Sequence, residues 1–505
     1  MKRIQKTILI FALLLLVFGT GNQTIMGNSM LEEKTQLIIL ADMGNEPDEE
    51  QQMVHMLTCC NEFELKGLIA ITGKYMKTDP KPELFLKLID GYEKVLPNLK
   101  NHARGWPNPG YLRDITKAGQ ENYGMEDVGK GKSSPGSELI KKVLLENNPK
   151  PVWIVVNAGS NTLAQALFDL RKQENAKVVN KVISKIRVFE NGAQDDAGAW
   201  ICSNFPGIHW IRSNYQTYAY GGPGGVEDGA VNEKLGPYYW SPYENSAEGQ
   251  NEWLKEHVME NHGALGKLYP ERYWDKWGYG FMEGGGTIPW MGLVNKGLFD
   301  IDHPRWGGWS GRFSKKKEAC FWSRHPDVKP NEKEHAPFYT YVEVSDTWTD
   351  PKTGLTYHSD YVPVWRWRQA MYNDQMARMD WCVKKYQDAN HHPVAGINGD
   401  TSNTILKWNV IPGEKILLDA SSSSDPDMDS LRFRWWVYQE AGTYPGTINI
   451  DKNREAEASL HLPTGAGSHE IHVVLEVTDT NPVIELYDYR RIILQVKPYQ
   501  IKRSP

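Results

Sequence analysis

The sequence predicts an α/β fold, an open and mostly parallel sheet flanked by helices, followed by a small carboxyl-terminal β-sandwich. The first part is predicted because an apolar strand, a polar loop and a helix follow one another three times. The second part is predicted because short alternating strand patterns separated by turn residues replace this order after about residue 390. At 505 residues the chain is long enough for two or three domains. We expect a signal peptide over 1–29, the α/β domain over 30–389 and the sandwich over 390–505.

The amino terminus has the pattern of a secretory signal. Basic residues open the chain, an apolar run follows from Thr7 to Phe18, and small and polar residues come next. We therefore expect export to the periplasm or the extracellular space, without a stable membrane span. The net charge of −6 gives no basic excess for nucleic acid. The five cysteines form no metal or redox motif, and we expect Cys59 and Cys60 to be core residues.

The first strand–loop–helix unit carries four acids in eight residues. The strand is expected at Leu37–Leu40, and the loop behind it holds Asp42, Glu46, Asp48 and Glu49. Such a cluster is stable when a cation or shared protons relieve the repulsion. With Gly44 permitting a sharp turn, the spacing suits an oxygen-liganded ion such as Ca²⁺. Acids that only decorate the positive end of a helix are the alternative, and the loop leaves both open.

Two further units repeat this order. A strand at Val152–Val156 runs into the polar residues 157–162 and a helix, and a strand at Lys185–Phe189 runs into 190–196 and a helix at 197–203. A fourth strand is expected at Ile208–Arg212, and further helices at 82–96 and 139–145, the latter with a cap formed by Ser134 and Glu138. Parallel strands present their carboxyl ends along one edge, so the polar loops predict one composite site there.

Residues 215–357 are rich in Gly, Trp and Pro and predict long loops that cap this site. Trp306 and Trp309 lie in a Gly-rich stretch, where their rings would stack on sugar faces or, alternatively, belong to the core. A helix is expected at Val364–Lys385. In the last domain, strands are expected at 415–418, 431–438, 458–462, 470–477 and 490–496. The segment Asp425–Asp429 predicts either a side-chain-bonded turn or a calcium site.

Three segments resemble nucleoside hydrolases. Asp42-Met-Gly44 with Asp48-Glu49, followed by the strand Gly67–Lys74, is similar to the family's Asp-rich loop and second strand. Asn161 stands where a family carbonyl binds calcium, and Asn191 with Asp195 matches a third segment. The resemblance implies a Ca²⁺ site formed by Asp42, Asp48, Glu49 and Asn161. It places Lys74 where an Asn usually contacts the sugar, Leu40 where the first Asp stands and Glu49 where the second metal Asp stands.

A second resemblance covers nearly the whole mature chain. Its motifs are Asn45-Glu-Pro-Asp-Glu, Gln194-Asp-Asp-Ala-Gly-Ala-Trp, Trp306-Gly-Gly-Trp and the Trp- and Arg-rich helix from Trp365. They resemble exported bacterial cellulose-binding proteins, which combine a nucleoside-hydrolase-like domain with an immunoglobulin-like carboxyl-terminal domain. The segment from Leu418 to Trp435 resembles the turn of polycystic-kidney-disease (PKD) modules.

The resemblance implies a metal-assisted hydrolase that acts on a glycosidic or N-glycosidic bond of a furanose-like or plant-polysaccharide-derived sugar. Asp42 would be the general base, and Glu46 a ligand or the acid. The expected substrate contacts come from the polar loops and the Trp stretch: Lys74, Asn191, Gln194, Asp195, Glu283, Trp306 and Trp309. The alternative is a binding protein for cellulose or another polysaccharide, with a hydrolase-like fold and no turnover.

Overall fold

The computed structural model describes residues 34–221, 247–273, 280–282, 285–295, 297–318, 327–329 and 338–498. The predicted signal peptide, Glu283 and Cys320 lie outside these ranges. The described residues from Thr35 onward belong to one compact unit. Among the described helices, none is long and apolar enough to cross a membrane.

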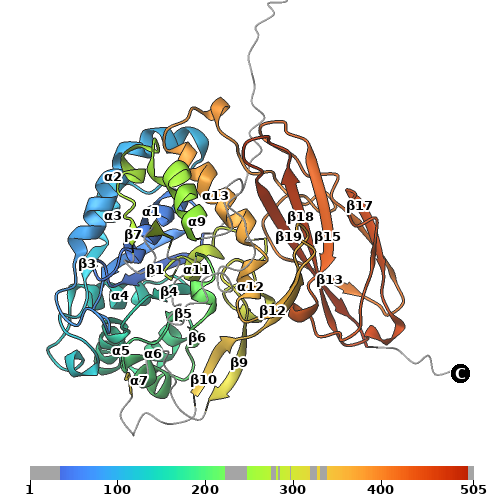
Figure 1. The fold of residues 1–505 in the computed structure, drawn as a ribbon. Helices are drawn as coiled ribbons and strands as arrows, with labels where there is room; N and C mark the ends of the chain where they lie inside the picture. Colours follow the sequence, from blue (N-terminus) through green and yellow to red (C-terminus); the bar gives the residue numbers. More distant parts are fainter. Residues whose placement is uncertain are drawn as a thin grey trace, which may run out of the picture. The chain divides into compact units, whose positions relative to one another are not determined.

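The α/β prediction is confirmed by an eight-stranded sheet in the order β3-β2-β1-β4-β5-β6-β10-β9 (Figure 1). All neighbours are parallel except β10 and β9, which are antiparallel. The strands are β1 (Gln36–Ala41), β2 (Glu64–Ala70), β3 (Thr116–Ala118), β4 (Val152–Val156), β5 (Ile186–Asn191), β6 (His209–Ser213), β9 (Phe313–Glu318) and β10 (Phe338–Glu343). The strand order reverses between β1 and β4, which is where doubly wound sheets bind ligands.

Apolar cores lie on both faces of this sheet. One core takes its buried side chains from α1 (Asp48–Cys59), α2 (Pro82–His102) and α13 (Arg368–Trp381). The other takes them from α4 (Pro135–Leu145), α5 (Asn161–Gln173), α6 (Ala176–Ile183) and α7 (Ala197–Asn204). Because helices cover both faces, β1 and β4 are buried along their whole length, and this is why they read as continuous apolar runs.

Shorter elements complete the α/β part. The short helices are α3 (Pro109–Asp114), α9 (Ala247–Leu254), α10 (Gly263–Gly266), α11 (Ile288–Met291) and α12 (Val362–Trp365). Two small hairpins pair β7 (Arg272–Tyr273) with β8 (Gly280–Phe281) and β11 (Asp346–Thr349) with β12 (Thr356–Ser359).

Three local predictions need correction. The helix expected at Val364–Lys385 is two helices, α12 and α13, separated at Arg366 and Trp367. The stretch expected to consist of loops supplies β9 and β10 to the main sheet. The cap of α4 is a reciprocal pair of Ser134 and Ser137, because the serine hydroxyl, rather than the Glu138 carboxylate, reaches the backbone amide of Ser134.

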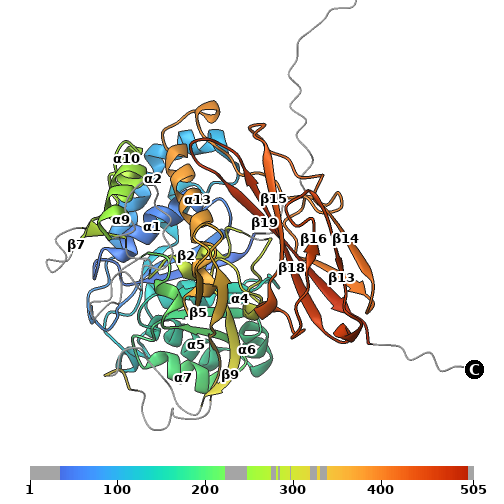
Figure 2. The same ribbon diagram turned by 45° about the vertical axis from the view of Figure 1, so that its right-hand side comes forward.

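The carboxyl-terminal strands form two facing sheets, as predicted (Figure 2). One sheet contains β13 (Leu406–Val410), β19 (Tyr487–Val496), β18 (Glu470–Asp479) and β15 (Leu431–Val437), and the other β14 (Lys415–Asp419), β17 (Glu457–His461) and β16 (Ile450–Asp451). The turn at 425–429 has the bonds of a side-chain-bonded turn, since Asp425 Oδ1 accepts from the amides of Asp427 and Asp429 at 2.8 and 3.1 Å.

Candidate functional site

The acidic loop lies at the carboxyl end of β1, where the strand order reverses. Asp42 directly follows the strand and is 3% exposed, while Asp48 and Glu49 are the first two residues of α1. Gly44 adopts a φ of +85°, which confirms the predicted sharp turn. Glu46 and Asp48 are half-buried, and Glu49 is buried. The fold therefore brings all four predicted acids to one place.

Burial and the charges of neighbouring acids favour the protonated forms of Asp42 and Glu49. Burial raises the pKa of Asp42 to about 8, and the charges of Asp48 and Glu46 add to the shift. Burial also raises the pKa of Glu49 well above its ordinary value, with help from Asp48 and Asp42. The hydrogen bond from Asn45 Nδ2 to Asp42 Oδ2, 3.1 Å long, opposes the shift of Asp42 without cancelling it.

Glu49 is fixed by two amide side chains that the sequence analysis did not select. Asn157 Nδ2 and Gln52 Nε2 donate to Glu49 Oε2 at 3.0 and 3.2 Å, and Trp290 Nε1 donates to Gln52 Oε1 at 2.9 Å. Asn157 is the first residue after β4, and its amide donates to the carbonyl of Leu40 on β1. Asn157 follows a buried strand just as Asp42 does, so the pattern of a polar residue after an apolar strand also predicts Asn157.

Gln194 and Asp195, which follow β5, contribute from the next loop. Gln194 Oε1 accepts from the Lys74 amide at 3.2 Å, and its Nε2 donates to the carbonyl of Asn157 at 3.3 Å. A Cβ placed on Gly73 would lie 2.8 Å from Gln194 Oε1 and 3.1 Å from Asp42 Oδ2. The loops behind β1, β2, β4 and β5 thus converge on the same point.

Asp195 joins two helix starts. Its Oδ2 accepts from the Asn161 amide at 3.1 Å and its Oδ1 from the Ala197 amide at 3.0 Å. Burial raises the pKa of this carboxyl to about 7, although both backbone bonds act in the opposite direction. Asp195 therefore fixes the amino-terminal ends of α5 and α7 beside the cluster.

Three buried amide oxygens accompany the acids. The Oδ1 atoms of Asn157, Asn161 and Asn191 have no hydrogen-bond partner among the described residues. The Nδ2 of Asn161 donates to the carbonyls of Asn122 and Gly124, and that of Asn191 to the carbonyl of Gly285 at 3.0 Å, so each Nδ2 is engaged. Buried polar atoms normally have partners. Unpaired amide oxygens beside carboxylates can serve as ligands of a hard cation or accept hydrogen bonds from sugar hydroxyl groups.

The chemistry of the donors fits Ca²⁺, but the acids do not form a closed cage. Among the described residues, His55, Cys59 and Asp374 are the one group of acid, histidine or cysteine side chains with three ligand atoms within 4.8 Å of one another. This group does not include the acids of the loop. Asp42, Asp48 and Glu49 are more widely spaced. A cation here would take amide oxygens or water in addition to these carboxylates.

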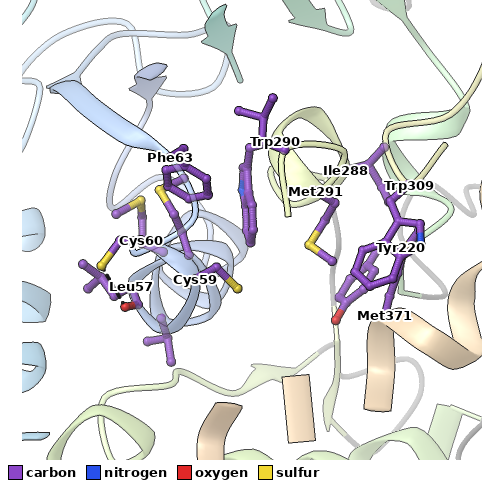
Figure 3. Packing of buried hydrophobic residues seen from close by; sticks show 14 of the residues in the cluster. Leu57, Cys59, Cys60, Phe63, Tyr220, Ile288, Trp290, Met291, Trp309 and Met371 are labelled. Atoms are coloured by element: carbon purple, nitrogen blue, oxygen red, sulfur yellow. Dashed lines mark hydrogen bonds between the residues drawn. The ribbon is translucent and has the colours of Figure 1, made fainter. Parts of the chain in front are cut away.

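The side chains of the other expected contacts interact with other groups. The Lys74 ammonium forms an ion pair with Asp327, so its backbone rather than its side chain contacts Gln194. Trp306 and Trp309 are 3% and 2% exposed. Trp306 stacks on His303 with ring centroids 3.9 Å apart, and Trp309 packs among apolar side chains (Figure 3). Tertiary packing covers both rings, so neither offers a free face to a sugar.

Comparisons with known proteins agree with the fold of both parts of the chain. The family model described as cellulose-binding Sde182, nucleoside hydrolase-like domain, matches residues 36–313, and that of the C-terminal domain of cellulose-binding protein Sde0182 matches residues 415–496. The solved structure of a nucleoside hydrolase-related hypothetical protein from Saccharophagus degradans, associated with carbohydrate metabolism, is 34% identical. The match covers 92% of this chain and 100% of that chain with a TM-score of 0.77. A search of the curated proteins returned no match.

Two other solved structures are more distant. The PKD domain of human KIAA0319 is 13% identical over 20% of this chain and 91% of that chain, with a TM-score of 0.15. The effector protein XOO4466 is 8% identical over 70% of this chain and 95% of that chain, with a TM-score of 0.36. Scores this low do not bear on function. The matches over both parts of the chain show that it belongs to the cellulose-binding Sde182 family, with its nucleoside hydrolase-like domain and its own C-terminal domain.

Proposed function

We propose that this protein is exported and hydrolyses a glycosidic or N-glycosidic bond of a furanose-like or plant-polysaccharide-derived sugar, assisted by Ca²⁺. One observation carries the proposal. Asp42, Glu49 and Asp195 are buried at the switch point of the sheet, and none of them forms an ion pair with a cationic side chain among the described residues. Such a cluster costs stability, and the unpaired amide oxygens beside it favour a ligand as the compensation.

The chain's own residues suit hydrolysis through an oxocarbenium-like transition state. Asp42, once ionised, accepts a proton from an attacking water as general base. Glu46 is the acid closest in sequence to Asp42, and its charge contributes to the raised pKa of Asp42. We assign Glu46 to protonate the leaving group. The negative charge of the cluster stabilises the positive charge that develops on the sugar ring. Asn157 and Gln52 hold Glu49 in place throughout.

Asp42, Asp48, Glu49 and Asn161 would hold the cation, with the unpaired amide oxygen of Asn157 as a further candidate ligand. When bound, Ca²⁺ supplies positive charge that favours ionised carboxylates and a more acidic water. Asn191 and Gln194 then remain to bind sugar hydroxyls, since Asn191 Oδ1 is unpaired among the described residues and Gln194 reaches the point where the loops converge.

A second function is favoured by the family description, which names cellulose binding. In that case the cluster would hold a cation and a sugar chain without turnover. The two functions share the fold, so only activity separates them.

The test is a hydrolysis screen of the purified protein on chromogenic furanosides and pyranosides, nucleosides and plant oligosaccharides, with Ca²⁺ or with chelator. We expect turnover that requires Ca²⁺ and falls by about 10²- to 10⁴-fold in Asp42→Ala. Glu50→Gln is the matched control, because Glu50 follows Glu49 in α1 but its carboxylate interacts with Lys81 and Lys87. No turnover on any substrate, together with retention on insoluble cellulose, would replace the hydrolase by the binding protein.

A further inference from the structure

Three side chains that commonly bind metals meet inside the fold, and none of them belongs to the proposed calcium ligands. His55 and Cys59 lie four residues apart on α1, so they share one face of that helix, and Asp374 lies on α13. One ligand atom of each residue lies within 4.8 Å of the ligand atoms of the other two. All three side chains are buried. The fold thus brings together a nitrogen, a sulfur and an oxygen ligand from two helices.

The distances between these atoms are close to those around a zinc ion. His55 Nε2 lies 3.9 Å from Asp374 Oδ2, and Cys59 Sγ lies 4.0 Å from the same oxygen. The buried His55 Nε2 has no hydrogen-bond partner among the described residues. With zinc bonds of about 2.0–2.3 Å and tetrahedral angles, ligand atoms lie about 3.4–3.6 Å apart. A shift of a few tenths of an ångström would therefore bring the three atoms into coordination distance of one ion.

The other polar atoms of His55 and Asp374 are held by further partners. Arg378 Nε donates to Asp374 Oδ1 at 2.7 Å, and His392 Nε2 lies 2.9 Å from the same atom, which leaves Oδ2 to face the other two ligands. The Tyr220 hydroxyl lies 3.5 Å from His55 Nδ1, which leaves Nε2 to do the same. Outer partners of this kind orient the carboxylates and imidazoles that bind metals.

The neighbouring charges fit a divalent cation. The Arg378 guanidinium forms ion pairs with Asp374 at 2.7 Å and with Glu62 at 3.2 Å. When a thiol such as that of Cys59 binds a metal, it releases its proton to solvent and becomes a thiolate. With the histidines counted as neutral, the two carboxylates and the thiolate exceed the guanidinium by two negative charges. One divalent cation balances this excess.

The mixture of nitrogen, sulfur and oxygen ligands is typical of Zn²⁺, whereas Ca²⁺ takes oxygen ligands. We propose that His55, Cys59 and Asp374 bind one Zn²⁺ ion, with water as the fourth ligand. The ion joins α1 to α13 and so fixes the helix whose first turn carries Asp48 and Glu49. This site does not depend on the proposed function.

The test uses Co²⁺, which replaces Zn²⁺ in sites of this kind and gives a charge-transfer absorption band when a thiolate binds it. We expect the purified protein, exchanged against Co²⁺, to show this band at one ion per chain and to lose it when Zn²⁺ is added. Cys59→Ser should abolish the band. Cys60→Ser is the matched control, because Cys60 is the next residue and equally buried, but its Sγ donates to the carbonyl of Leu57 at 3.1 Å (Figure 3).

A second measurement needs no variant. X-ray absorption of the zinc-loaded wild-type protein should show one sulfur ligand at about 2.3 Å, with nitrogen and oxygen ligands at about 2.0–2.2 Å. Excess Ca²⁺ should leave the cobalt band unchanged, because Ca²⁺ does not compete for thiolate and imidazole ligands.

Four outcomes would overturn the zinc site: no band in the parent, a band that persists in Cys59→Ser, loss of the band in Cys60→Ser, or a zinc spectrum without sulfur. None of them bears on hydrolysis. Conversely, a hydrolysis screen without turnover would leave the zinc site standing, so the two proposals fail independently.

Discussion

Asp42 and Asp374 are both buried, but the pKa of Asp42 is raised and that of Asp374 is lowered. Burial raises the pKa of Asp42 to about 8, and the charges of Asp48 and Glu46 add to the shift. Asp374 of α13 is also fully buried, yet the Arg378 guanidinium and the His392 and His55 imidazoles hold its pKa well below the ordinary value. Arg378 Nε and His392 Nε2 donate to Asp374 Oδ1 at 2.7 and 2.9 Å. The difference lies in the partners and not in the burial.

The comparison teaches how to separate a structural acid from a functional one. Asp374 connects α1, α13 and the start of the carboxyl-terminal part, since His55 lies on α1 and His392 follows α13. Its charge is neutralised within the fold, and the fold depends on it. Asp42 and Glu49 have no such cationic partner among the described residues, so their burial costs stability unless the proposed ligand binds.

The largest effect on stability is expected at Asp374. Asp374→Asn leaves Arg378 buried beside a neutral side chain, which destabilises a protein by about 3–5 kcal/mol. Denaturant unfolding measures this loss, and Asp388→Asn is the control, because Asp388 is exposed at the end of the same segment and should change stability by less than about 0.5 kcal/mol. A loss at Asp374 no larger than that of the control would show that the ion pair is not structural.

The next effect concerns calcium. If the cluster holds Ca²⁺, the ion at a hundred times its dissociation constant should raise the free energy of unfolding by about 2.7 kcal/mol. Asp48→Asn should abolish this gain. Asp427→Asn serves as the control, because Asp427 lies in the acidic turn of the sandwich, where its carboxylate accepts from the His391 amide at 2.7 Å. Loss of the gain in Asp427→Asn alone would place the ion in the turn.

The smallest effect is a pH dependence of the chelated protein. Asp42 and Asp195, with pKa values of about 8 and about 7, keep protons in the folded state at pH values where the unfolded chain has released them. The unfolded state then binds fewer protons, so stability falls as pH rises from about 4 to 8. Asp42→Asn should make this decline shallower and raise stability at pH 8 by about 0.5–2 kcal/mol.

The buried histidines also change stability in this pH range. Their contribution is the same in Asp42→Asn and in its parent, so it cancels when the two stability curves are compared. Asp374 does not affect stability in this pH range, because its pKa is lowered and its protonation changes stability only below about pH 4. Identical slopes for Asp42→Asn and its parent would contradict the raised pKa of Asp42.

Local pattern predicted the strands that position the site. The apolar run before Asp42 became β1, the run at Val152–Val156 became β4 without change, and the acids and amides behind them came together as expected. The sequence left open whether Trp306 and Trp309 face a sugar or belong to the core, because a Gly-rich sequence does not reveal whether a distant segment covers it. In the structure Trp306 meets His472 of β18, and Trp309 meets Tyr489 of β19.

The sequence by itself determined the order of strand, polar loop and helix, and with it the edge of the sheet at which the acids gather. These features depend on residues close together in the chain, where apolar periodicity and turn chemistry act. The tertiary structure decided how deeply the two aspartates are buried and which distant groups meet them. Asp374 pairs with Arg378, four residues later in α13, and also with His55, which lies more than three hundred residues earlier. Among the described residues, the charges that act on Asp42 are those of the acids Asp48 and Glu46. Burial and contacts between distant segments depend on the whole fold, and so local periodicity did not separate the two aspartates.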